Sequence, residues 1–327
     1  MGWCTTRDLD LFLAVAGDYL TSKAAENTLL LSAAQDAREA QEARDARDAR
    51  EAREAPAVPD GAAADPSGRL FGWWEPPDGG GPRGAFLHDP PAPLLIAGRA
   101  PEMAAALATE LARAGRSVCG VDAPVAAADA FAAAWSQRAG VAVRVHRRSR
   151  VYRIAGLRAA GEGPAGRARV ATAADRPLLV EWLRAFRAEV GQLTGAPEAT
   201  ADELLGYGGA IFWEAGGSPV ALAAVTRPVA RTVRISMVYT PPELRHRGYG
   251  VAVSLAVSRA ALAGAGERGG GHVSQVVLIT DGARPLRQAA RLGYELIGER
   301  ALLSFGPPTG PLPRLPTGPL PRLRGQP

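Results

Sequence analysis

Apolar residues recur at helical spacing over residues 177–187, directly after a polar segment that can start a helix. Thr172 and Asp175 have the spacing of a capping box, and Pro177 suits the first turn of a helix. The apolar positions that follow are Leu178, Leu179, Trp182, Leu183 and Phe186. This spacing predicts an amphipathic helix with one buried face.

The second half of the chain, to which this helix belongs, continues with short apolar runs that alternate with longer helical patterns. A second short helix is predicted at 197–205, followed by three strands that a Gly216-Gly217-Ser218 turn helps to separate. The predicted strands are 210–215, 219–226 and 232–240, and after them come a helix at 248–263, a strand at 273–280, a helix at 284–292 and a closing strand. The order β-α-α-β-β-β-α-β-α-β favours an α/β (α+β) fold with a mixed, mostly antiparallel sheet flanked by helices.

The first half of the chain shows the same succession of patterns. Phe71-Gly72-Trp73-Trp74 precedes a turn and an apolar strand much as Ile211-Phe212-Trp213-Glu214 does. A helix at 100–114, a strand at 117–121 and a helix at 127–138 follow, and the second helices of the two halves end alike, at Arg138-Ala139-Gly140 and Arg291-Leu292-Gly293. We therefore predict a duplicated fold with lobes at 1–160 and 168–306, joined by a glycine-rich linker at 161–167.

Two segments lack any pattern that could bury apolar surface. Residues 36–55 repeat acid-Ala-Arg/Gln, and a period of three against 3.6 residues per turn leaves no apolar stripe. This segment is expected to be a solvated helical insert. Residues 307–327 repeat PTGPLPRL and are expected to be a disordered, proline-rich tail.

Composition narrows the class of protein. The 47% of hydrophobic residues never form the uncharged run of about 18 that a membrane helix needs, and the N-terminus lacks the features of a secretory signal. Cys4 and Cys119 are isolated, so neither a metal site nor a disulfide framework is predicted, and a cytoplasmic location fits best.

The formal net charge of +5 invites a nucleic-acid interpretation, which the sequence does not favour. Five arginines crowd one stretch, but no aromatic residues interleave them as stacking platforms, so a solvated strand face is the simpler explanation. These arginines are Arg144, Arg147, Arg148, Arg150 and Arg153. A mildly basic protein also suits a ligand that carries several phosphates.

One motif carries candidate chemistry. The strand that ends near Thr240 is followed by Arg245-His246-Arg247-Gly248-Tyr249-Gly250, which opens the helix at 248–263. Glycines allow close approach of the backbone to a ligand, and a helix start presents unpaired N–H groups and a positive dipole end. The loop is thus suited to a pyrophosphate, although glycines that only shape a turn remain an alternative.

These residues fit the R-x-x-G-x-G signature of the GNAT acetyltransferase superfamily. Val238-Tyr239-Thr240-Pro241-Pro242-Glu243 before the loop, and Val277-Leu278-Ile279-Thr280-Asp281 and Leu292-Gly293-Tyr294 after it, resemble that family as well. The resemblance implies two GNAT-like lobes in tandem, the first degenerate, and an N-acetyltransferase that passes an acetyl group from acetyl-coenzyme A directly to a small-molecule or protein amine.

The resemblance also implies which residues bind the cosubstrate. The loop would hold the pyrophosphate, the strand beside it would bond the pantetheine arm, and the thioester would enter where strands 232–240 and 273–280 splay apart. The residues carried over are Met237, Val238, Tyr239, Arg245, His246, Arg247, Gly248, Tyr249 and Gly250.

The catalytic groups are less clear. Relatives often carry an Asn and an acidic Tyr where this chain has Leu286 and Ala289, although a thiolate leaving group needs little protonation. Glu243 and Glu214 are candidate bases for an ammonium acceptor, but either one has an ordinary structural alternative. A non-catalytic acyl-coenzyme A sensor with a degenerate site is therefore the second hypothesis.

Two further features bear on the site. The first lobe has Gly98-Arg99-Ala100-Pro101-Glu102 at the equivalent loop, where an acid and the missing second glycine argue against coenzyme A. Its tryptophans Trp73, Trp74 and Trp135 are candidates for a cleft wall or for the core.

A dinucleotide-binding fold fits poorly, because Val253 takes the third small position and residues 241–247 separate strand from glycine.

Overall fold

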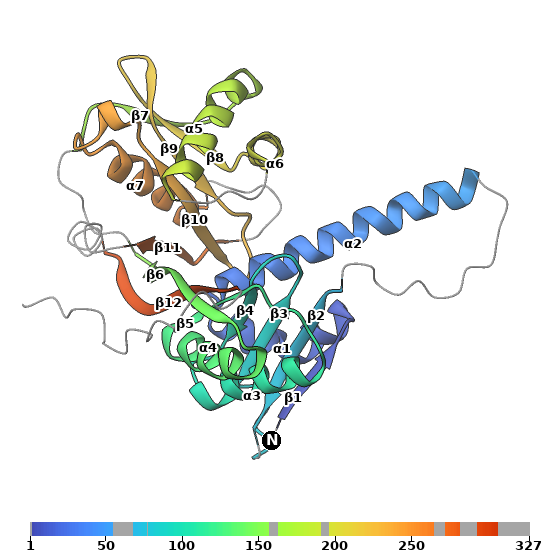
Figure 1. Ribbon diagram of the computed structural model, residues 1–327. Helices are drawn as coiled ribbons and strands as arrows, with labels where there is room; N and C mark the ends of the chain where they lie inside the picture. The colour runs from blue at the N-terminus through green and yellow to red at the C-terminus, as the bar shows by residue number, and fades with distance from the viewer. Residues whose placement is uncertain are drawn as a thin grey trace, which may run out of the picture. The chain divides into compact units, whose positions relative to one another are not determined.

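The computed structural model describes residues 2–54, 68–76, 78–156, 163–190, 196–264, 272–281 and 293–306. The chain forms two compact units that interleave along the sequence. The first comprises residues 1–8, 62–148 and 300–327, and the second comprises residues 9–61 and 149–299. Figure 1 labels the helices and strands of both.

The first unit contains a mixed sheet in which every neighbouring pair but one is antiparallel. Its strand order is β1-β2-β3-β4-β5-β12, with β4 and β5 parallel. The strands are β1 (Gly2–Thr6), β2 (Leu70–Glu75), β3 (Gly84–His88), β4 (Leu94–Ala97), β5 (Gly120–Pro124) and β12 (Glu295–Gly306), of which residues 300–304 pair with β5.

Two helices provide the core of this unit. They are α3 (Pro101–Arg113) and α4 (Val125–Ala139), which match the helices predicted at 100–114 and 127–138. Both bury alanine-rich faces against the sheet, together with Met103, Phe131 and Trp135. Trp3 closes the cluster and donates a 2.9 Å hydrogen bond from Nε1 to the Met103 carbonyl oxygen.

The second unit repeats this arrangement with the same pattern of directions. Its strand order is β7-β8-β9-β10-β11-β6, and β10 and β11 form the parallel pair. The strands are β7 (Arg167–Val170), β8 (Ala210–Ala215), β9 (Ser218–Val225), β10 (Thr232–Tyr239), β11 (Gln275–Asp281) and β6 (Ala142–Ile154), of which residues 149–154 pair with β11.

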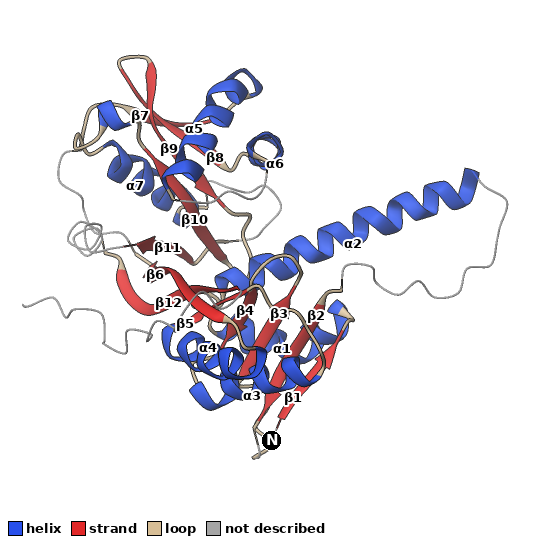
Figure 2. Ribbon diagram, in the orientation of Figure 1, coloured by secondary structure: helices blue, strands red, loops and turns tan. Residues whose placement is uncertain are grey.

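Helices cover both faces of the second sheet (Figure 2). On one face lie α5 (Arg176–Glu189) and α6 (Pro197–Tyr207), packed on Phe212, Leu222 and Met237. On the other lies α7 (Tyr249–Leu262), packed on Ala221, Ala223 and Ile235. Successive residues of a strand point to opposite faces, which is why Leu222 belongs to one core and its neighbours 221 and 223 to the other.

The N-terminal helices belong to the second unit, which the sequence did not predict. They are α1 (Leu9–Ser22) and α2 (Thr28–Glu54), and between them Ala25 packs with Val151 and Val277. The charged repeat is helical, as predicted, and its side chains are largely exposed from Arg38 onward. Its first residues do contribute contacts, since Ala37 is buried.

An ion pair also ties α2 to the second unit. Glu39 lies 3.3 Å from Arg227, whose guanidinium stacks over the Tyr207 ring at 4.4 Å from the centroid. Residues 36–39, which were predicted to begin a solvated insert, therefore contribute contacts to the second unit.

The structure departs most from the predicted domain ranges at the last strand of each repeat. Helix α4 leads into β6, which pairs with β11 of the second unit, whereas β12 at the end of the second repeat pairs with β5 of the first unit. The predicted lobes at 1–160 and 168–306 follow sequence order and separate residues 149–154 from β11. β6 alternates basic with apolar residues only in part, and β12 shows no strict alternation, so the sequence alone does not select the sheet that each one joins.

The arginine-rich stretch lies on β6 and forms ion pairs. Arg148 pairs with Asp129, Arg150 with Glu299, and Arg153 with Glu295. The described helices include none that combines the length and apolarity needed to cross a membrane. Three predicted segments lie outside the described residues: the tail at 307–327, the linker residues 161–162 and the helix at 284–292. Gly293, which follows that predicted helix, is described.

Candidate functional site

The sheet of the second unit opens between its two parallel strands. Thr232–Ile235 of β10 pair with Gln275–Leu278 of β11, and the pairing ends there. Beyond that point β10 pairs only with β9, through a register shift between Ile235 and Met237, while residues 279–281 of β11 pair with β6. This opening lies where the sequence predicted that strands 232–240 and 273–280 would splay apart.

The predicted strand residues line the opening. Met237 and Tyr239 point into the core under α5 and α6, and Val238 packs on the α7 side. Their backbone edge toward β11 has no strand partner in the described residues. An extended ligand can hydrogen-bond to such an edge as an added strand does.

A short loop connects the end of β10 to α7. A 3-10 turn at Pro242–Leu244 leads into Arg245, and His246 then takes a positive φ of 65°. Gly248 follows with φ 82° and ψ 1°, and α7 begins at Tyr249. Because left-handed backbone is unfavourable for residues with a Cβ, Gly248 is the position where this turn needs glycine.

The loop leaves a row of donors open at the start of α7. The Ala252 amide donates a 3.0 Å hydrogen bond to the Gly248 carbonyl, which is the bond that joins the loop to α7. Within the described part of the chain, residues 245 and 246 lie in a hydrogen-bonded turn, and the amides of residues 248–251 donate to no backbone carbonyl. Unpaired amides at the positive end of a helix dipole bind anions, so the geometry fits the phosphate groups for which the sequence predicted it.

The two arginines of the loop have different surroundings. Arg245 donates from Nε to the Thr240 carbonyl at 3.0 Å and pairs with Glu189 at 2.5 Å. Arg247 is exposed and makes a long 3.4 Å contact with the Glu243 carbonyl. The sequence singled out Arg245 but not Glu189, because 56 residues separate the two.

The candidate bases also differ. Glu243 is exposed in the 3-10 turn, and its charge, with that of Glu189, adds to the burial that raises the pKa of Tyr239. Glu214 lies at the end of β8. A hydrogen bond from Arg169 is the largest cause that lowers the pKa of Glu214, and Arg167 lowers this pKa further. Glu243 lies in the turn that follows β10, whereas Glu214 lies on β8.

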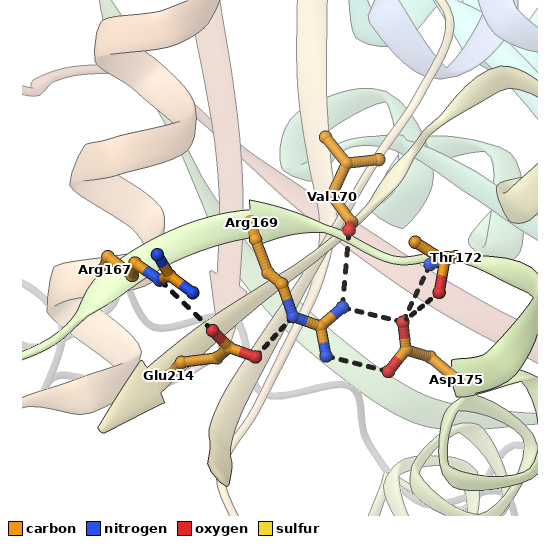
Figure 3. A network of polar contacts seen from close by, with 6 residues as sticks. All are labelled: Arg167, Arg169, Val170, Thr172, Asp175 and Glu214. Carbon is orange, nitrogen blue, oxygen red and sulfur yellow. Dashed lines mark hydrogen bonds and ion pairs between the residues drawn. The ribbon is translucent and has the colours of Figure 1, made fainter. Parts of the chain in front are cut away.

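Glu214 belongs to a network that joins β7 to the start of α5 (Figure 3). Arg169 pairs with Glu214 and forms two bonds to Asp175, at 2.7 and 2.8 Å. Asp175 in turn accepts from the Thr172 amide at 2.8 Å and completes the predicted capping box. The Arg169 hydrogen bonds are the largest cause of the lowered pKa of Asp175.

We expect this network to make the stability of the fold depend on pH. A carboxyl whose folded pKa lies below its unfolded value stabilises the fold above about pH 4, the unfolded pKa, and that contribution is lost as the pH falls further. Arg169→Gln should lower the melting temperature at pH 7 by roughly 3 °C, a figure that allows for solvent screening. The difference from the wild-type protein should shrink below pH 4.

The matched control for this measurement is Arg176→Gln, which breaks an exposed pair with Asp202. It should change the melting temperature little at either pH. An Arg169→Gln effect that is as large at pH 3 as at pH 7 would contradict the electrostatic account.

The described residues of the first unit form no equivalent cradle. At the start of α3, Pro101 has no N–H to donate, Glu102 brings a negative charge into the first turn, and no side chain caps the helix at Ala100. The tryptophans there do not form a cleft wall. Trp135 is buried in the core and Trp74 packs against it, while Trp73 is buried and donates to Glu75 at 2.8 Å.

The remaining positions named from the sequence lie between β11 and β12. Leu286 and Ala289, the slots of the Asn and acidic Tyr, lie outside the described residues. Tyr294 is buried, and its hydroxyl lies 2.7 Å from the Ser258 hydroxyl of α7. Among the described residues no group of three or more His, Cys, Asp or Glu side chains is placed to hold a metal ion.

No family model matches the sequence, and no curated protein matches it. A solved structure of a Drosophila protein is 12% identical and has a TM-score of 0.57, covering 93% of this chain and 98% of its own. That similarity shows a shared fold along nearly the whole length of both chains.

Other similar structures carry names that match the resemblance stated from the motif. A GCN5-related N-acetyltransferase from Kribbella flavida is 19% identical, with a TM-score of 0.45 over 68% of this chain and 86% of that one. A tandem GNAT protein from the clavulanic acid biosynthesis pathway is 18% identical, with a TM-score of 0.40 over 74% and 84%. The two repeated units agree with the predicted tandem arrangement.

Proposed function

We propose that the second unit is an N-acetyltransferase that transfers an acetyl group from acetyl-coenzyme A directly to an amine. The observation that carries the proposal is the combination at the end of β10: a parallel pair that opens after Ile235, and a loop that presents the amides of residues 248–251, unpaired among the described residues, at the start of α7. One feature accommodates an extended arm, and the other accommodates a diphosphate. Few ligands other than coenzyme A thioesters need both.

The proposal gives each part of the site a role. The loop Arg245–Gly250, which includes His246 and Tyr249, surrounds the pyrophosphate, and Arg247 adds positive charge from the solvent side. The backbone of Met237, Val238 and Tyr239 holds the pantetheine arm. The bound cosubstrate supplies the reactive acetyl thioester.

The chain would then accelerate the transfer by orientation. Holding the thioester in the opening fixes its carbonyl against the incoming amine, and a backbone N–H of β10 polarises the carbonyl oxygen. Glu243 is our candidate for the group that takes a proton from an ammonium acceptor. Glu214 is the weaker candidate, because its lowered pKa and its arginine partners oppose proton uptake.

An amine acceptor suits the charge around the opening. Burial is the largest cause that raises the pKa of Tyr239, and the charges of Glu189, Glu243 and Glu181 raise it further while that of Arg245 lowers it, so carboxylates outnumber the arginine on the side of β10 that faces α5. Such a field attracts a cationic acceptor, whether a small molecule or a protein amine. The proposal places the protein in the cytoplasm, where the free thiols of Cys4 and Cys119 are stable.

The test is a thiol-release assay with the full chain. The protein should bind acetyl-coenzyme A in calorimetry and release free thiol faster in the presence of one or more amines from a panel of polyamines, amino sugars and peptide amines. Binding without thiol release from any amine would favour the acyl-coenzyme A sensor. Absence of binding would overturn both functions.

A further inference from the structure

Arg245 is the residue of the loop whose side chain has the most definite partners. Its Nε donates to the Thr240 carbonyl and its terminal nitrogen pairs with Glu189, the last residue of α5. The guanidinium is planar, and its donors lie in a fixed fork, so two partners at once define its direction.

That direction leads away from the open amides. Helix α5 covers the face of the sheet formed by Phe212, Leu222 and Tyr239, whereas α7 covers the opposite face. Arg245 therefore reaches from the loop toward the α5 side, and the donors for an anion stand at the start of α7. A side chain held in this way is poorly placed to bind the pyrophosphate itself.

Glu189 is an unusual residue for its position in α5. A carboxylate at the C-terminal end of a helix faces the negative end of the helix dipole, which is unfavourable by itself. The Arg245 guanidinium offsets this charge. The pair thus joins the end of one helix to the loop that begins another.

We propose that Glu189 and Arg245 together position the coenzyme A loop, and that Arg245 acts on the cosubstrate through the shape of the loop and not as a phosphate ligand. Glu189 is then a positioning residue that the sequence motif does not include. This inference rests on the proposed function, since it concerns how the same loop binds acetyl-coenzyme A.

The test compares calorimetric affinities for acetyl-coenzyme A across variants of the full chain. Glu189→Gln and Arg245→Gln should each weaken binding about threefold to fivefold, as expected for a partly exposed ion pair. The double variant should be no weaker than either single variant, because both remove the same contact. Glu198→Gln, which breaks the exposed pair between Arg184 and Glu198, is the control and should bind as the wild-type protein does.

Salt dependence separates a positioning role from direct phosphate contact. Arg247→Gln should reduce the dependence of affinity on salt, because it removes a charge near the phosphates, whereas Arg245→Gln and Glu189→Gln should leave it unchanged. Melting temperatures of the unliganded variants should remain near that of the wild-type protein.

Two results would overturn the inference while leaving the proposed function intact. In one, Glu189→Gln binds acetyl-coenzyme A as well as or better than the wild-type protein, since Glu189 would then only compete for Arg245. In the other, Arg245→Gln reduces the salt dependence as Arg247→Gln does. If the wild-type protein does not bind acetyl-coenzyme A, the proposed function itself fails.

Discussion

Gly248→Val should weaken the binding of acetyl-coenzyme A about a hundredfold while leaving the protein folded. Gly248 has φ 82°, which a β-branched residue adopts only at a cost of about 1–2 kcal/mol. The loop will relax toward ordinary backbone and turn the amides of residues 248–251 away from a common point. Losing two charge-assisted hydrogen bonds amounts to roughly 3 kcal/mol, a weakening of about a hundredfold that calorimetry can measure.

Gly216→Val is the matched control for this experiment. Gly216 also has a positive φ, of 60°, and a Cβ there meets no atom within 4 Å. It lies in the turn between β8 and β9, so the substitution introduces similar strain without touching the loop. Both variants should lose similar stability, and only Gly248→Val should lose affinity. Equal affinities would mean that the glycine serves a turn and not a ligand.

Phe212→Ala should strongly destabilise the second unit. The ring is fully buried, meets Trp182 edge-to-face at 5.4 Å, and lies under the Arg169 guanidinium at 5.4 Å. Truncating a buried phenylalanine costs about 3–5 kcal/mol, because the transfer energy is lost and a cavity remains. Urea denaturation followed by tryptophan fluorescence measures the change in the free energy of unfolding.

Val170→Ala on the neighbouring strand provides the comparison. Val170 is 46% exposed, so the same type of truncation should cost less than about 0.5 kcal/mol. A small effect at Phe212 would contradict the view that α5, β8 and β10 share one core.

Much of the second unit follows from local sequence. The strands predicted at 210–215, 219–226 and 232–240 and the helices at 197–205 and 248–263 lie within a few residues of β8, β9, β10, α6 and α7. Apolar periodicity and turn residues act over a few positions, so they define elements without reference to the rest of the fold. Gly140, which ends α4, and Gly293, its counterpart in the sequence repeat, both have positive φ.

The loop of the candidate site could be located in the sequence for the same reason. Gly248 and the residues around it stand together in the sequence because a strand, a turn and a helix start are consecutive. The ion pair between Glu189 and Arg245 was not predicted, because it depends on how α5 packs across the end of β10. The same limit applies to Trp74 and Trp135, whose place in the core comes from the packing of α3 and α4 and not from their spacing.

The sequence by itself determined the order of elements from α5 to β11, the duplication, the charged helix and the glycine loop, since each depends on residues that are near one another in the chain. Only the tertiary structure decided that residues 149–154 of β6 complete the second sheet, that residues 300–304 of β12 complete the first, and that α1 and α2 belong to the second unit. Strand pairing is made by backbone hydrogen bonds that nearly any residue can supply. The choice of partner therefore depends on the buried faces that the whole chain brings together.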